Sequence, residues 1–161
     1  MVDLAWMWNS PVLAHVTALA IAYALAFPIG WDREREERSA GLRTFPLVAV
    51  ASCGFIQATE HLTVGSPEAQ ARIIEGLITG IGFIGGGAII KQGGAVQGTA
   101  TAAGLWVTGA IGIAVGLGVY DVAAVIAAFT LFTFRGLSPL KHQSQPDDEI
   151  SAPGSSRRIE R

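Results

Sequence analysis

The sequence predicts an all-α protein, a polytopic transmembrane bundle of about five helices. Three observations lead to this fold class, and the first two concern composition. Half of the 161 residues are hydrophobic and only 15% are charged, which is too apolar for an ordinary soluble domain of this length. The third observation is the length of the uncharged runs. Residues 12–31 and 99–120 each extend for about 20 residues, enough at ~1.5 Å per residue to cross a hydrocarbon core of roughly 30 Å.

The first helix is expected over about residues 11–31. Trp6, Trp8 and Trp31 lie near its two ends, where aromatic side chains favour the interface between lipid and water. The run ends in ALAFP, an A-x-A pattern typical of signal-peptide cleavage. However, no Lys or Arg precedes it, and the apolar run is long for a signal peptide. We therefore interpret it as a permanent helix.

Four further helices are expected over about residues 43–62, 72–90, 99–118 and 121–138. The second and the fifth are short, and the second reaches span length only if Arg43 and Glu60 extend to the interfaces. A chain of four helices, with the last two fused, is the main alternative. The helices form a membrane domain of residues 1–135. Residues 139–161 are polar and rich in Pro and Ser, which predicts a disordered cytoplasmic tail.

Basic residues are unequally distributed over the connecting segments. With five helices, all of the eleven Lys and Arg residues except Arg72 fall on one side of the membrane. Cytoplasmic loops are enriched in Lys and Arg, so the sequence predicts an N-terminus outside and a C-terminus in the cytoplasm. A four-helix chain would place the basic tail outside, which favours five helices.

Glycine is concentrated in the third and fourth predicted helices, often at four-residue spacing. In lipid this spacing lets helices approach closely. The residues that we assign to helix packing are Gly80, Gly82, Gly85, Gly86, Gly87, Gly98, Gly112 and Gly116. We expect Gly82, Gly86, Gly112 and Gly116 to bring the third and fourth helices together. Each of the three adjacent glycines at 85–87 weakens a helix by roughly 1 kcal/mol relative to alanine, which predicts a bent or broken third helix.

A run of seven charged residues, Asp32 to Arg38, follows the first helix. Asp32 and Arg33 lie where the first helix leaves the membrane, and Arg43 lies where the second enters. We expect these three side chains to form a hydrogen-bonded cluster at the cytoplasmic mouth of the bundle. The simpler interpretation is a topology anchor, because Lys and Arg at helix ends commonly extend to the interface. Both interpretations stay open.

Three other features offer candidate functional residues. Arg72 and Glu75 are three residues apart, so they share a helix face and can pair. A carboxylate within a membrane helix is by default a functional candidate. Thr101 and Trp106 are candidates on the fourth helix, although a Thr hydroxyl can bond its own helix and Trp106 can serve packing alone. The G-x-G-x-x-G in GIGFIGGG lies inside an apolar helix, so it does not indicate nucleotide binding.

Three segments, in order, carry a resemblance to a known family: GWDREREERSAGLRTFPLVAVASCG, ARIIEGLITGIGFIGGGAIIKQGG and GTATAAGLWVTGAIGIAVGLGVY. They resemble the MgtC/SapB family of bacterial inner-membrane proteins, whose pattern includes G-x-E-R, AGLRT, an Arg before GIGFLGAG, and GLTTAA-x-x-W. The resemblance covers about residues 30–120 and implies a membrane domain of about five helices. The motif positions are those of Asp32, Arg33, Arg43, Arg72, Thr101 and Trp106.

This chain departs from the family pattern at several positions. Asp32 stands where the family has Glu, Gly86 where it usually has Ala, and Thr99-Ala100 where it has Leu-Thr. The acidic residue expected before the third helix is out of register, since Glu68 precedes Arg72 by four residues rather than three. Longer members also carry a soluble C-terminal domain resembling the ACT fold. We do not expect it here, and none of its functions is carried over.

The resemblance implies a regulatory or accessory protein of the bacterial inner membrane. Such proteins are linked to magnesium limitation and virulence, and act on a membrane ATPase or on the membrane potential. The main alternative is a small transporter or channel for Mg²⁺ or another cation, favoured by the expected break in the third helix, by Glu75 and by the carboxylates at the mouth. Against it, Mg²⁺ prefers several oxygen ligands, and acids are few in the membrane part. Whether a metal binds stays open.

No enzymatic activity is expected, because no nucleophile–base pair and no metal-binding motif is apparent, and no cofactor is expected either. The net charge of −2 argues against nucleic acid as a partner. The expected partners are the lipid bilayer and another membrane protein such as an ATPase. A homo-oligomer is an open alternative.

Overall fold

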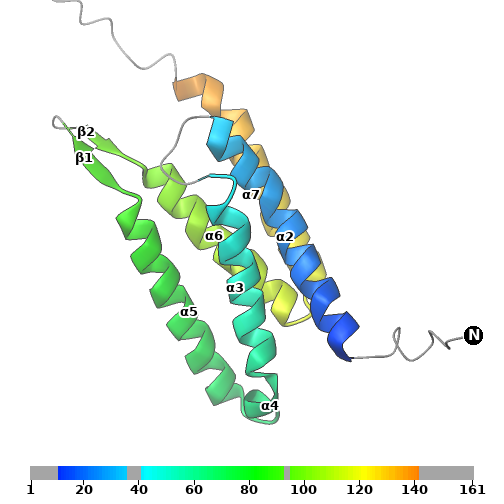
Figure 1. Ribbon diagram of the computed structural model, residues 1–161. Coiled ribbons are helices and arrows are strands. Elements are labelled where there is room, and N and C mark those ends of the chain that lie inside the picture. The colour runs from blue at the N-terminus through cyan, green and yellow to red at the C-terminus, as the bar shows by residue number, and fades with distance from the viewer. Residues whose placement is uncertain (1–10, 36–40, 93–94, 142–161) are drawn as a thin grey trace, which may run out of the picture.

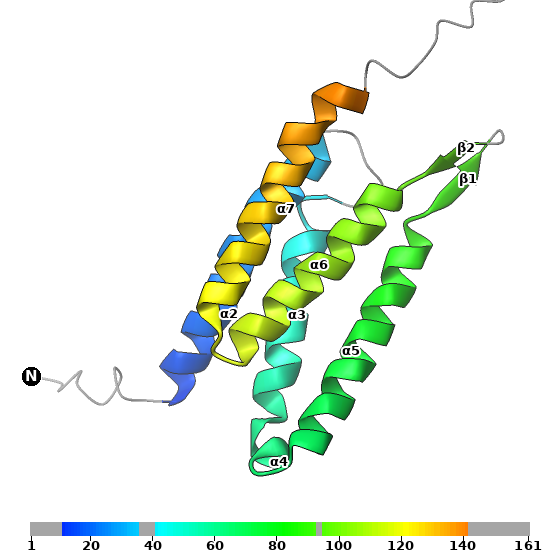
Figure 2. The same cartoon turned by 180° about the vertical axis from the view of Figure 1, so that it is seen from behind.

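The structure is a helical bundle with one short hairpin (Figures 1 and 2). It is a computed structural model that describes residues 11–35, 41–92 and 95–141. The long helices of these ranges are α2 (Pro11–Arg35), α3 (Thr44–Ala58), α5 (Pro67–Gly87), α6 (Thr99–Gly116) and α7 (Tyr120–Lys141). A single turn, α4 (Glu60–Thr63), connects α3 to α5. The strands β1 (Ile90–Gln92) and β2 (Ala95–Gln97) pair antiparallel between α5 and α6, with Lys91 opposite Val96.

The predicted helical membrane fold is confirmed. Three helices are long and apolar enough to cross a membrane: α2, α6 and residues 120–137 of α7. Helix α3 is also apolar but shorter, at 15 residues. The described residues do not include Trp6, Trp8, Arg38 or the tail beyond residue 141.

Helix α6 occupies the centre of the bundle. It packs against α2, α3, α5 and α7, and its buried side includes Leu105 and Ile111. Its residues are almost uniformly apolar, as expected for a helix with neighbours on several sides. On α2, the buried Ala18, Ala22 and Ala26 recur every four residues, and these small side chains allow a close approach of the neighbouring helices.

Helix α5 lies at the edge of the bundle, and only Ile81 and Gly85 on it are buried. Its packing against α6 includes two close contacts at glycines. The Ile81 side chain lies against Gly109, and Gly85 faces the backbone of Ala102, so that a Cβ atom on Gly85 would lie 3.2 Å from the Ala102 carbonyl oxygen. The Ser66 hydroxyl accepts a hydrogen bond from the Ala69 amide at 3.4 Å, which starts α5 earlier than the expected residue 72.

The predicted break in this helix is not found. The α-helix continues through Gly85, Gly86 and Gly87 and ends there, and the hairpin β1–β2 follows. Gly98 ends the hairpin with φ of +86°, a conformation that glycine adopts without strain. A Cβ atom at Gly98 would also collide with the Ala88 carbonyl. Gly98 therefore serves the turn before α6 rather than contact between helices.

The glycine contacts correct the predicted packing of the third and fourth helices. Gly112 and Gly116 of α6 face α3, not α5: a Cβ atom on Gly112 would meet the Ala49 carbonyl, and one on Gly116 would lie 2.8 Å from Ile56 Cβ. On α5, a Cβ atom would meet no described atom within 4 Å at Gly80, Gly82, Gly86 or Gly87. A four-residue spacing shows that two glycines share a face, but it does not identify the helix opposite.

The described basic residues are concentrated at one end of the bundle, which also carries Asp32 and Glu34. Figure 1 shows the end of α2, the start of α3, the hairpin and the end of α7 at one end. The basic residues carried there are Arg33, Arg35, Arg43, Lys91 and Arg135. The opposite end carries Glu60, Glu68, Arg72 and Asp121. The separation that supports a cytoplasmic basic end is therefore present in three dimensions.

This charge separation predicts the orientation in the membrane. A reporter fused after Arg161 is expected to read as cytoplasmic, and one inserted near Ser66 as external, because Lys and Arg are retained on the cytoplasmic side. Paired phosphatase and fluorescent-protein fusions at the two sites measure this directly. Opposite readings at both sites would overturn the predicted orientation.

Candidate functional site

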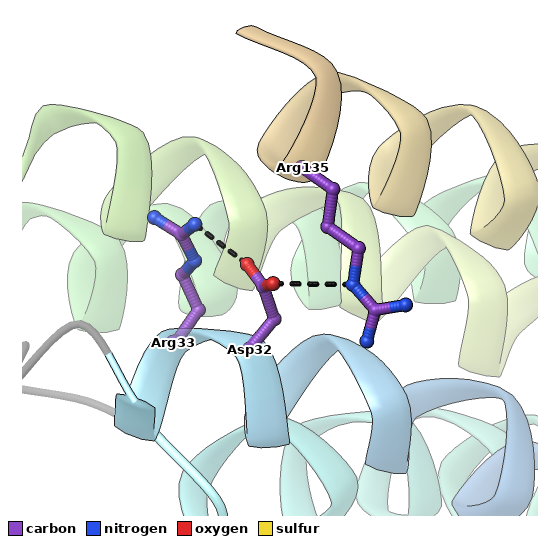
Figure 3. Close-up of polar contacts among 3 residues, drawn as sticks. All are labelled: Asp32, Arg33 and Arg135. Carbon is purple, nitrogen blue, oxygen red and sulfur yellow. Dashed lines mark hydrogen bonds and ion pairs between the residues drawn. The ribbon is translucent and has the colours of Figure 1, made fainter. Parts of the chain in front are cut away.

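A charged cluster joins α2 to α7 at the basic end of the bundle (Figure 3). Asp32 lies near the end of α2 and accepts two hydrogen bonds from arginines. Arg33 Nη2 donates to Asp32 Oδ2 at 2.7 Å, and Arg135 Nε donates to Asp32 Oδ1 at 3.3 Å. Both carboxylate oxygens are thus engaged. We call Asp32, Arg33, Arg135 and the adjacent Phe134 the Asp32 cluster.

The two arginines of the cluster differ in their environment. The Arg33 side chain is 3% exposed, whereas the Arg135 side chain is 61% exposed. The guanidinium carbon of Arg33 lies 3.9 Å from the centroid of the Phe134 ring, which is within the range of a cation–π interaction. Arg33 therefore has a charged partner beside it and an aromatic face against it. Its burial makes it the structurally critical arginine of the cluster.

Phe134 of the Asp32 cluster packs at Gly104 of α6, beside Phe45 of α3. A Cβ atom on Gly104 of α6 would lie 2.8 Å from Phe134 Cζ and 3.0 Å from Phe45 Cε1. Gly104 therefore provides a flat surface on which both rings pack, and Phe45 is fully buried there. The ring on α7 and the ring on α3 meet at this position, and Arg33 of α2 lies over the α7 ring. A larger residue at Gly104 would separate them.

The start of α3 is held to the end of α2 by its own contacts. The Leu42 amide donates a hydrogen bond to Glu34 Oε2 at 3.0 Å, and Gly41 packs directly against Glu34. A Cβ atom on Gly30 would lie 3.2 Å from both the Gly41 carbonyl oxygen and Phe45 Cβ. The glycines of GWDRE and AGLRT thus allow two backbone segments to touch. This contact positions Phe45 beside Gly104, where Phe134 of the Asp32 cluster also packs.

Arg43 is not part of the cluster, which corrects the expected trio of Asp32, Arg33 and Arg43. It lies just before α3, where its side chain is exposed and lines a groove between α3 and α5. The structure gives its guanidinium no ion pair among the described residues. Arg135 of α7 takes the expected place, because the end of α7 lies beside the end of α2.

Arg72 and Glu75 are both exposed on α5, and no ion pair within the described ranges joins them. The predicted pairing is therefore not made, although the spacing permits it. Glu75 thus presents a carboxylate that no described residue pairs with, on an apolar part of α5.

Thr101 and Trp106 lie on different sides of α6. Thr101 is 1% exposed, and its hydroxyl oxygen has no hydrogen-bond partner among the described residues. Trp106 is half exposed and lines a small apolar cavity of about 300 Å³ between α5, α6 and α7. Among the described residues, neither Thr101 nor Trp106 takes part in the hydrogen bonds or the ring contact of the Asp32 cluster.

Three residues at the site were not selected from the sequence: Phe134, Arg135 and Gly104. The charge pattern did place Arg135 on the same side as Asp32, and this was the available signal. Within the described part of the chain, no three His, Cys, Asp or Glu side chains gather closely enough to hold a metal ion.

Comparison with known proteins identifies relatives of this chain. Its sequence matches the model of the MgtC family over residues 19–143. Protein MgtC of Brucella abortus is 40% identical over 129 residues, covering 80% of this chain and 53% of that protein. Protein SrpB of Synechococcus elongatus is 36% identical over 135 residues, covering 76% of this chain and 74% of that protein.

A third relative, protein MgtC of Salmonella typhimurium, is 35% identical over 147 residues, covering 90% of this chain and 61% of that protein. The chain therefore spans about half the length of the Brucella relative and less than two thirds of the Salmonella one. No solved structure matches this chain.

Proposed function

The chain belongs to the MgtC family of membrane proteins, and from this we propose that it is a regulatory or accessory protein of the bacterial inner membrane. In this proposal it crosses the membrane several times and supports adaptation to magnesium limitation, including survival inside a host. It acts on another membrane protein, such as an ATPase, or on the membrane potential. The link to magnesium comes from the family resemblance.

One observation carries the choice of a regulatory role over transport. The carboxylate at the basic mouth of the bundle, Asp32, has both oxygens engaged by arginines, and Arg33 is buried over Phe134. A carboxylate held in this way is neutralised, whereas a cation pathway needs oxygen ligands that face the ion. The Asp32 cluster therefore acts as a clasp that holds α2 and α7 in register. A rigid bundle of this kind suits a protein that presents a surface to a partner.

Transport of Mg²⁺ or another cation remains the second candidate, and it is favoured by Glu75. This carboxylate is exposed on α5, within the apolar stretch of that helix and beside the small residue Gly76. An ionisable group at such a position is a functional candidate by default. If copies of the chain associated through α5, Glu75 residues would line their interface.

Reconstitution separates the two candidates. Purified protein in liposomes that contain a magnesium-sensitive dye is expected to pass no more Mg²⁺ than empty liposomes. Added to inverted membrane vesicles that lack it, the same protein is expected to lower ATP-driven proton pumping. Arg33→Gln should abolish this effect by loosening the clasp, whereas Arg35→Gln should retain it.

Two results would contradict the regulatory proposal. One is Mg²⁺ flux by the protein alone that disappears in Glu75→Gln, which would establish the transporter. The other is a protein that moves no ion and leaves proton pumping and membrane potential unchanged in the vesicles.

A further inference from the structure

An apolar groove runs between α3 and α5 on the outside of the bundle. Its volume is about 780 Å³. The wall on α3 includes Leu47 and Phe55, both exposed, and the wall on α5 includes Leu77 and Ile84. Gly80 also belongs to the α5 wall, and a Cβ atom there would meet no described atom within 4 Å. We call this feature the α3–α5 groove.

Two of the three hydroxyl side chains that line the groove are satisfied by carbonyls of α3, and the third, Thr44, lies beside Arg43 at the mouth. Ser52 Oγ donates to the Val48 carbonyl at 2.8 Å, and Thr59 Oγ1 donates to the Phe55 carbonyl at 2.7 Å. Ser52 and Thr59 therefore do not require a polar ligand along the length of the groove. An occupant must therefore be apolar over most of its length.

The groove has a cation at one end only. Arg43 lines it at the start of α3, on the basic end of the bundle, and is exposed without an ion pair among the described residues. Arginine binds a phosphate group through two parallel hydrogen bonds. The arrangement thus combines an anion-binding group at the mouth with an apolar channel behind it.

The groove is long enough for a lipid chain. The lining residues on this side run from Arg43 to Thr59, sixteen residues later, which is about 24 Å along a helix at ~1.5 Å per residue, so the groove is longer than one leaflet is thick. One leaflet of the hydrocarbon core is roughly 15 Å thick, half of the roughly 30 Å total. A phosphate at Arg43 would therefore place its acyl chain alongside Leu47, within one leaflet.

We propose that the α3–α5 groove binds an anionic phospholipid, with the phosphate at Arg43 and one acyl chain between α3 and α5. The charge is what selects the lipid, because an acyl chain gains little by leaving other lipid chains for an apolar groove. Basic sites between membrane helices bind anionic headgroups in the same way. This inference is independent of the regulatory role proposed above.

Native mass spectrometry of the full chain in detergent tests the proposal, with phosphatidylglycerol as the anionic probe and phosphatidylcholine as the zwitterionic one. We expect wild-type protein to retain one phosphatidylglycerol with about fivefold preference over phosphatidylcholine, the effect of one arginine near a headgroup. Arg43→Gln should remove the preference. Arg35→Gln is the matched control, because Arg35 is exposed at the same end but does not line the groove.

A second variant tests the groove itself without changing charge. Gly80→Leu fills the α5 wall and should reduce retention of phosphatidylglycerol, whereas Gly82→Leu, which has equal free space outside the groove, should not. Equal retention of the two lipids by wild type, or an unchanged preference in Arg43→Gln, would overturn the proposal. A dimer mass that Gly80→Leu abolishes would also overturn it, and would assign the groove to a second copy of the chain.

Discussion

Replacing Gly112 by leucine is expected to prevent α6 from packing against α3 and to destabilise the whole bundle. A Cβ atom at Gly112 would collide with the Ala49 carbonyl and lie 2.8 Å from Ser52 Cβ. The backbone of α3 cannot rotate away as a flexible side chain could, so the two helices must separate. Helix α6 contacts every other long helix, and the separation would therefore disturb the entire core.

The expected cost of Gly112→Leu is roughly 3 kcal/mol or more, at the upper end of the range for overpacked cores. For a chain of this size this corresponds to a fall in Tm of about 6–12 °C. Thermal unfolding in a mild detergent, followed by circular dichroism or by a fluorescent thiol probe for Cys53, measures the shift. Cys53 is buried on α3 beside the same contact, so its exposure reports separation of these helices.

Gly82→Leu is the matched control for this prediction. The substitution is the same and the residue also lies in a long apolar helix, but a Cβ atom at Gly82 meets no described atom within 4 Å. We expect Gly82→Leu to unfold within about 2 °C of wild type, as surface substitutions usually do. If both variants unfolded alike, the contact between Gly112 and α3 would carry no special weight. A loss of stability in Gly82→Leu alone would place that glycine in an interface between copies.

The comparison of these glycines shows which parts of the fold could be predicted from the sequence. Uncharged runs near residues 12–31 and 99–120 indicated helices α2 and α6, because a membrane span requires that length and polarity. The partner of each helix face could not be predicted in this way. Gly82 and Gly112 follow the same spacing rule, yet one is open and the other touches backbone, since spacing is a local property and packing is not.

The candidate site, like the fold, could be predicted only in part from the sequence. Asp32 and Arg33 were selected by their place at the end of α2, and the structure joins them at 2.7 Å. The third member was taken to be Arg43, which is near in sequence, whereas the structure uses Arg135, 103 residues from Asp32. Sequence distance carries no information about that contact. Phe134 was missed for the same reason, because an aromatic residue in an apolar helix is unremarkable until a buried cation is found over it.

Arg33→Lys is expected to destabilise the bundle although it preserves the charge. Lysine cannot reproduce the planar guanidinium that stacks on Phe134 while donating to Asp32. Because Arg33 is 3% exposed, disrupting its interactions should cost on the order of 2–4 kcal/mol. We expect lower membrane abundance, a lower Tm in detergent and poorer growth in low magnesium.

Arg135→Lys provides a contrast within the same cluster. Arg135 donates to the same carboxylate as Arg33, but its side chain is 61% exposed and the distance is 3.3 Å. Exposed pairs of this kind contribute roughly 0–1 kcal/mol. The Arg135 variant should therefore retain nearly wild-type stability. Both arginines donate to Asp32, but only Arg33 is buried and stacked on Phe134, so the comparison tests the combined effect of burial and stacking.

The alternative interpretation of the charged run makes the opposite prediction. A topology anchor depends on the number of Lys and Arg residues and hardly on acidic ones, so Arg33→Lys and Asp32→Asn would both be silent. Our interpretation requires Arg33→Lys to be costly while Arg35→Lys, at an exposed position two residues later, is tolerated. Equal tolerance at Arg33 and Arg35, in both stability and growth, would reduce the run to an anchor. A loss of stability in the Arg33 variant alone would show that the specific contacts of the Asp32 cluster matter, because a rule that counts charges does not distinguish Arg33 from Arg35.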